Sequence, residues 1–403
     1  MQKVIALVLS LGLLLPGAAS AQRLDREHLS IAAGGRFNHV LNNGHHDIYG
    51  RLVASYDSPG AELQLGIDTH PADSSWWANA YNYPHLALGF SWNNTGSLRF
   101  KNDSRLGDFF NVYAKAQIDI LRAGFFSFGP FLEVGAAYTP YKYNYFSNPA
   151  CREIGSNIEG LLGAGIDFKF QILPQWELAV NAALTHHSNG MTGVPNVGIN
   201  ELSAAARVRY FFAPVPTLKR ERGLPRPDFP KGLHFNIHGY AGVHACDVER
   251  RANEKLYESD LYEIKNGTPA PPRFRTGLGV EMTYRYAPVF SSGLGVEAHY
   301  ADNQYRRNDL VLNGEEDPRG YSPFYASAYL IQEFHYNRLS LHVMLGIYFF
   351  KKTGLTEDMP WWYQKIGLRY NIPHCRGLYL SFDMRAHNLD RSYCLEPGLG
   401  YTF

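Results

Sequence analysis

Apolar and polar residues alternate along most of the chain, and residues 177–188 show the pattern clearly. The even positions of this run are apolar as far as Leu184, whereas the odd positions include polar residues such as Asn181. Alternation with period 2 predicts a β-strand with one apolar and one polar face. The apolar face continues into His186 and Ser188, whose Cα atoms would lie about 7 Å apart. A base and a hydroxyl therefore share one surface.

The next run, residues 201–212, alternates in the same way, with leucine, alanine and valine on one face and arginine on the other. Counting back along this strand places Asn200 on the apolar face, which is the face of His186 and Ser188. The neighbouring Glu201 falls on the polar face. The predicted register therefore separates these two residues, although they are adjacent in the chain.

Alternation and turn residues predict strands along the whole chain, in two sets. The first set comprises residues 28–41, 48–57, 61–69, 85–93, 110–122, 126–140, 158–172, 175–188 and 201–212. The second comprises residues 233–245, 273–286, 292–303, 322–336, 339–351, 362–372, 378–389 and 394–403. Bacterial single-chain barrels have an even number of strands, so one candidate, among the first three, is not expected to span on its own.

These sets predict an all-β fold, an antiparallel transmembrane β-barrel of the bacterial outer membrane. Residues 1–21 have the features of a secretory signal peptide, and residues 22–212 hold the first strand set. A segment rich in proline and charge, residues 213–231, separates it from the second set, residues 232–403. One barrel of about 16 strands is the favoured interpretation, because closure leaves no unpaired edge and the sets join in phase. Two barrels of about eight strands are the alternative.

The connections between the predicted strands are short at one end and long at the other. Outer-membrane barrels have short periplasmic turns and longer extracellular loops, so the loop at residues 189–200 is expected outside the cell. The strand end with His186 and Ser188 would then lie in the leaflet that contains lipopolysaccharide. The chain ends in alternating Leu399, Tyr401 and Phe403, which resembles the signal for the barrel-assembly machinery.

Composition supports a membrane barrel over its alternative, a secreted β-sandwich. Aromatic residues make up 14% of the chain, with 27 Tyr and 24 Phe, as expected for aromatic girdles. The formal net charge of +1 gives no reason to expect nucleic-acid binding. The 4 cysteines are scattered, so no metal or organic cofactor is predicted. The sequence allows two alternatives for the cysteines, a disulfide between Cys151 and Cys246 or unpaired thiols.

A motif follows the alternating strand: His186-x-Ser188-Asn189, then Pro195-Asn196-x-Gly198-Ile199. It resembles the PagL-type lipid A 3-O-deacylases, a family of outer-membrane β-barrel esterases. The resemblance covers roughly residues 48–212 and is specific only around the motif, with weaker similarity at residues 130–135, 157–159 and 163–165. It does not reach the second half of the chain. The family has an acidic residue where this sequence has Asn200.

The resemblance implies hydrolysis of an acyl ester of lipid A, with lipopolysaccharide of the outer leaflet as the partner. Ser188 would be the nucleophile, His186 its base and Asn200 the residue that orients the imidazole, while Asn196 would contribute to the oxyanion hole. A lone His-x-Ser is more often a polar strand end, and the second motif element shifts the preference toward a catalytic site. A non-catalytic barrel, acting as a pore, an adhesin or a lipid-binding protein, is the alternative. The oligomeric state and the role of the second strand set stay open.

Overall fold

The computed structural model describes residues 28–41, 57–70, 75–215, 228–302, 322–352, 360–388 and 391–403. The predicted signal peptide, most of the candidate strand at 48–57 and most of the linker lie outside these ranges. Strands dominate the described residues, as the alternation predicted. No helix in the described ranges is long and apolar enough to cross a membrane.

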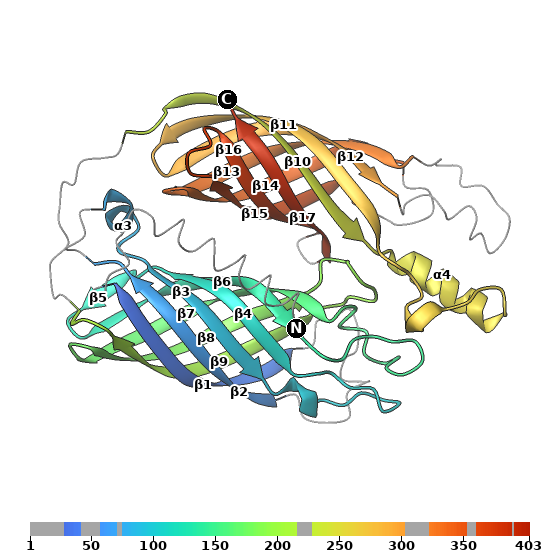
Figure 1. Cartoon of the computed structure of the whole chain (residues 1–403), viewed down its shortest axis with the longest axis horizontal. Helices are drawn as coiled ribbons and strands as arrows, with labels where there is room; N and C mark the ends of the chain where they lie inside the picture. The colour runs from blue at the N-terminus through green and yellow to red at the C-terminus, as the bar shows by residue number, and fades with distance from the viewer. Residues whose placement is uncertain are drawn as a thin grey trace. The chain divides into compact units, whose positions relative to one another are not determined.

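The first strand set forms a closed antiparallel barrel of slanted strands (Figure 1). β4 pairs with β6, and β1 pairs with β9, so the ring β4-β3-β2-β1-β9-β8-β7-β6 closes on itself. Among the described residues β5 pairs with β6 alone, within the turn that leads from β4 to β6. The bounds are β1 Leu29–Leu41, β2 Asp57–Asp68, β3 His85–Asn93, β4 Phe109–Gln117, β5 Leu121–Ala123, β6 Phe126–Tyr138, β7 Ile158–Leu173, β8 Trp176–Ser188 and β9 Ile199–Phe211, with α3 Trp76–Ala80 and η1 Thr95–Ser97 in connections.

The second strand set closes in the same way, from β10 to β17, with β10 paired to β17. Its bounds are β10 Gly232–His244, β11 Arg273–Ala287, β12 Phe290–Ala301, β13 Phe324–Tyr336, β14 Leu339–Phe350, β15 Trp362–Asn371, β16 Leu378–His387 and β17 Arg391–Thr402. The loop from β10 to β11 contains α4 Asp247–Glu258 and η2 Lys265–Gly267.

The preference for one large barrel is therefore wrong, because the strands form two separate barrels. β9 is paired on both sides, with β8 and β1, which leaves no edge for β10. Alternation assigns a face to each residue but does not identify the neighbouring strand. Eight strands are enough to close a ring in which every backbone group finds a partner, so neither set needs the other for closure.

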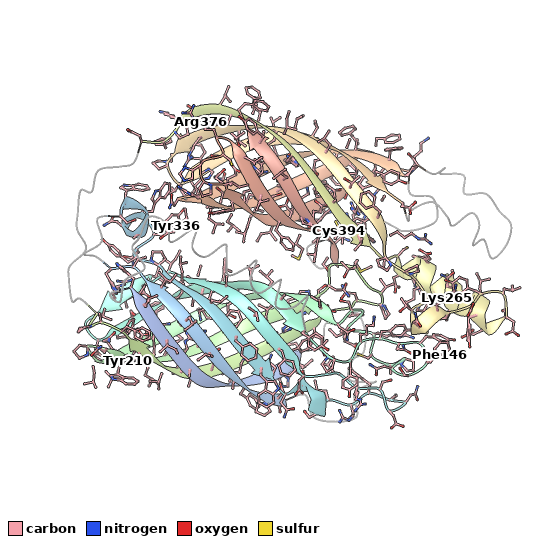
Figure 2. The ribbon with its side chains drawn as sticks, in the orientation of Figure 1. Phe146, Tyr210, Lys265, Tyr336, Arg376 and Cys394 are labelled. Carbon is pink, nitrogen blue, oxygen red and sulfur yellow. The ribbon has the colours of Figure 1, made fainter. Side chains whose placement is uncertain are left out.

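Both barrels are apolar outside and charged inside, which confirms the transmembrane class and excludes the secreted sandwich. Large side chains such as Leu184 and Leu330 face outward and are at least half exposed. At the end of the first barrel where β8 begins, the rings of Trp176 and Tyr210 lie 4.9 Å apart, as part of an aromatic girdle. Figure 2 labels Tyr210 there. A lipid-facing belt with aromatic borders is typical of outer-membrane barrels.

The chain divides into two compact units. The first holds residues 1–142, 148–188 and 197–227, and the second holds residues 143–147, 189–196 and 228–403. None of the four cysteines is in a disulfide, so the bond considered for Cys151 and Cys246 is not formed. Cys151 is instead fully buried in an apolar cluster of the first unit, which occupies its side chain with packing contacts.

Candidate active site

Two neighbouring strands of the first barrel, β8 and β9, position the predicted residues. Along β8 the outward row is exposed as far as Leu184, at 50%, and becomes covered at Ser188, at 7%. His186 lies between them on this row and is half-buried. The base and the hydroxyl therefore share the outward face, where the lipid-facing belt ends and the long loops begin.

His186 stands directly opposite Asn200 in the ladder between β8 and β9. Its Nδ1 lies 2.7 Å from Asn200 Oδ1. An amide oxygen can only accept, so Nδ1 carries the hydrogen and donates it. In the neutral ring this leaves Nε2 as the acceptor, which is the tautomer that a general base requires.

The register agrees with the one predicted from parity, because Glu201 lies opposite Thr185 and faces the lumen. Its carboxylate accepts a hydrogen bond of 2.8 Å from Asn93 Nδ2. His187 also faces the lumen, where it stacks on Phe109 with ring centroids 4.4 Å apart. These two residues belong to the packed interior of the barrel, on the opposite side of the wall from His186.

Gly198 of the motif makes room for the imidazole. A Cβ at this position would lie 2.7 Å from His186 Cε1, closer than real Cβ atoms approach, and the φ of +78° also favours glycine. The backbone holds this close approach, since Gly198 N donates to Glu153 O at 3.0 Å and Val197 N donates to Arg152 O at 3.3 Å. Residues 152 and 153 were missed from the sequence, because a carbonyl contact leaves no side-chain signal.

A buried apolar cluster in the first unit fixes the loops around the start of β9. Ile199 of the motif is 1% exposed within it. The other members come from strands β1, β4 and β6 and from the long loops at the same end: Val40, Leu98, Phe100, Leu106, Phe109, Ala137, Ala150, Cys151 and Ile154. Such packing gives the first residues of β9, and with them Asn200, a defined position.

Across from Ser188 in the β7–β8 ladder stands Gly160. A Cβ at Gly160 would lie 3.1 Å from Ser188 O, so glycine keeps this neighbouring position open. Gly160 is not part of the sequence motif, so the sequence did not point to it. It lies in β7, the strand that pairs with β8.

Asn196 lies in the loop segment that groups with the second compact unit. Its Oδ1 accepts a hydrogen bond of 3.3 Å from Asn189 N, and Asn189 Nδ2 donates to Gly193 O at 3.1 Å. These bonds give the loop internal structure. The carboxamide of Asn196 also carries an N–H₂ group, and an N–H donor is the type of group that an oxyanion hole requires.

In comparisons with known proteins, each barrel matches a different family model. Residues 62–209 match the family model of lipid A 3-O-deacylase (PagL), and residues 234–403 match that of the C-terminal domain of acyloxyacyl hydrolase. The resemblance expected from the motif is therefore confirmed, and the second strand set has a family match of its own. No curated protein matches the chain significantly.

Several similar solved structures align with about half of the chain, and others align with 93% of it. The crystal structure of the outer membrane enzyme PagL is 16% identical, covering 47% of this chain and 99% of that one, with a TM-score of 0.28. Neisserial surface protein A is 10% identical, covering 45% and 96%, with a TM-score of 0.28. The attachment invasion locus protein Ail of Yersinia pestis is 16% identical, covering 46% and 98%, with a TM-score of 0.26.

Proposed function

We propose that this protein, whose residues 62–209 match the lipid A 3-O-deacylase family, is an outer-membrane serine esterase that removes an ester-linked acyl chain from lipid A. The observation that carries the proposal is the 2.7 Å contact between His186 Nδ1 and Asn200 Oδ1, on the same strand face as Ser188. It orients a neutral imidazole on the strand face that also carries a serine hydroxyl, and an adjacent base is what activates such a weak nucleophile.

In the first half of the reaction, His186 Nε2 takes the proton of Ser188 as Oγ attacks the ester carbonyl. The carbonyl π bond breaks, and its electron pair becomes an oxyanion, for which the amide of Asn196 is the proposed donor. A donor of this kind contributes about 3 to 4 kcal/mol in comparable hydrolases. The oxyanion then re-forms the carbonyl, the bond between the acyl carbon and the sugar oxygen breaks, and His186 gives its proton to that leaving oxygen, so the acyl chain stays on Ser188.

In the second half, water replaces the serine as the nucleophile. His186 Nε2 accepts a proton from the water, whose oxygen attacks the acyl carbonyl, and the proton then returns to Ser188 Oγ as the acyl bond breaks. The products are a fatty acid and a lipid with one free hydroxyl. Throughout both halves Asn200 holds the Nδ1–H, so the imidazolium is oriented although no carboxylate contacts it in the described residues.

The position of the site supports a lipid substrate. The outward row of β8 is a lipid-facing surface up to Leu184, and His186 and Ser188 follow on the same row. An ester at the boundary between acyl chains and headgroup would lie at this depth while its chains stay in the hydrocarbon region. The substrate would not have to leave the membrane to react.

A direct test is mass spectrometry of lipid A from cells that express the full-length protein. We expect the loss of one acyl chain with the wild type, and no loss with Ser188→Ala or His186→Ala. Ser97→Ala, which removes an exposed loop hydroxyl at the same end of the barrel, is the matched control and should leave hydrolysis unchanged. Unaltered lipid A with an assembled wild-type protein would reject the activity.

A further inference from the structure

The two loops beside the candidate site expose basic side chains that have no acidic partner. Arg105 lies in the first loop, and Lys142 and Arg152 lie in the second; the two arginines are exposed and Lys142 is half-buried. Among the described residues, none of the three is within ion-pair distance of a carboxylate. Within residues 98–106 and 141–155 the only exposed acid is Asp103, since Glu153 is buried.

Buried contacts hold these loops in place. Residues 98–106 form a hairpin, with Arg99 bridged to Arg105 and Phe100 N donating to Ser104 O at 2.7 Å. Ala150 N donates to Ser104 Oγ at 3.1 Å, which joins the hairpin to the second loop. The basic side chains therefore project from folded loops whose backbone is already ordered.

Asn148, only 6% exposed, joins the two loops a second time. Its Oδ1 accepts from Arg105 N at 2.8 Å, and its Nδ2 donates to Arg105 O at 3.1 Å and to Lys142 O at 2.8 Å. The Arg105 guanidinium also lies over the Tyr141 ring, 4.0 Å from its centroid. Positions that are set in this way lose little conformational entropy when a ligand binds.

The same loops are attached to the proposed catalytic residues. Arg152 O and Glu153 O accept the backbone N–H groups of Val197 and Gly198, and Gly198 packs against the His186 ring. Arg152 is thus one backbone hydrogen bond from Val197, which directly precedes Gly198. Any group bound by Arg152 would be close to the ester that is cut.

We infer that Arg105, Lys142 and Arg152 form a binding site for a phosphate monoester on the headgroup of the lipid substrate. The inference rests on the proposed function. A guanidinium matches the geometry of a phosphate and can bind it through two parallel hydrogen bonds, while an ammonium contributes charge. Phosphate binding at this position would fix which ester of the lipid reaches Ser188 and would select phosphorylated glycolipids over neutral ones.

Binding can be measured without turnover by using the full-length Ser188→Ala protein in detergent micelles. The probes are bis-phosphorylated lipid A and the same lipid with its phosphates removed. We expect Arg105→Gln/Arg152→Gln in this background to raise the dissociation constant for the phosphorylated probe about 10-fold, the value of one charge-assisted hydrogen bond. Affinity for the phosphate-free probe should not change.

Lys101→Gln is the matched control, because it removes the same charge from the tip of the same hairpin. Equal weakening by Lys101→Gln would mean a general charge effect, and equal affinity of the parent protein for both probes would mean that no phosphate is recognised. Either result overturns the inference.

In the catalytically intact protein, Arg105→Gln/Arg152→Gln should raise KM and leave kcat unchanged. Fatty acid release by that protein tests the proposed function separately.

Discussion

The identity of one side chain, Asn200, decides how the proposed base is oriented. Asn200→Ala should lower turnover by something on the order of 10² to 10⁴, the scale seen when the third member of a catalytic triad fails. Asn200→Asp places a carboxylate oxygen at the 2.7 Å contact with Nδ1 and should retain or raise turnover. Steady-state release of fatty acid measures both effects.

Glu201→Ala is the control for Asn200→Ala, since Glu201 faces the lumen and contacts Asn93. Its loss should change turnover little. An inactive Glu201→Ala combined with a normal Asn200→Ala would show that the lumen-facing carboxylate, and not the outward amide, is the catalytic partner of His186.

Gly198 offers a second prediction at the residue scale. In Gly198→Ala the new methyl group would overlap the His186 ring, so we expect the imidazole to shift and turnover to fall on the order of 10²-fold, as for a displacement of about 1 Å. Gly35→Ala is the control, because a Cβ there has nothing within 4 Å. Both variants should still form barrels that shift on a gel when boiled. Full activity of Gly198→Ala would mean that the ring position is not critical.

Parity along β8 and β9 was enough to predict that His186 and Asn200 share a face, because the side-chain period of a strand is fixed. The backbone hydrogen bonds by which Arg152 O and Glu153 O hold residues 197 and 198 could not be predicted in this way. It is made by backbone carbonyls of a loop that approaches from another part of the sequence, and every residue type has such a carbonyl. The hydrogen bonds of Asn148 with the backbone of Arg105 and Lys142 could not be predicted for the same reason.

At the scale of elements, the turn that leads from β4 to β6 depends on one buried carboxylate. Asp119 accepts from Lys169 Nζ at 2.7 Å and from Arg122 Nε at 2.9 Å. Burial alone would raise the pKa of Asp119, but the two nearby cations and the hydrogen bonds outweigh it and hold that pKa below its ordinary value. The carboxylate form is therefore stabilised by folding.

This direction predicts how the turn responds to acid. A depressed carboxyl pKa contributes stability above the unfolded value, about 3.9 for Asp, and the contribution is lost as the pH falls through the lower folded value. Amide hydrogen exchange at residues 118–128, corrected for its intrinsic pH dependence, should show less protection near pH 3 than near pH 6. In Asp119→Asn the turn should be less protected at pH 6 and show no such change. A wild-type turn that is equally protected at both values would contradict the prediction.

Strand positions follow from alternation because each strand has one face to lipid and one to the lumen. The match is close for β8, expected at 175–188 and observed at Trp176–Ser188. β5 was not foreseen as a separate strand, because its three residues at Leu121–Ala123 are all exposed and pair only with β6. A segment this short has no face pattern to detect.

At the scale of the whole molecule, the charged interiors bear on the alternative of a passive pore. In the first barrel Lys115 contacts Asp167 at 2.8 Å, and in the second Lys365 contacts Glu297 at 2.5 Å, all four side chains being buried. The interior of an eight-stranded barrel is only wide enough for its own side chains. We therefore expect no steady ion conductance in planar bilayers from the full-length protein. Stable channels that persist in Ser188→Ala would support the pore.

The number of barrels is the feature that the sequence left undecided, since the alternation is identical for one ring of sixteen strands and two rings of eight. The structure closes each ring by itself, through β1–β9 and β10–β17. A protease site inserted between Pro216 and Pro227 therefore gives a clear test. After cleavage of the folded protein, each half should migrate separately on an unheated gel, and each should shift when boiled. In a single ring the halves would be joined by two β-ladders, so they would migrate together until heated. Co-migration of the cleaved halves in strong detergent would be evidence for one barrel.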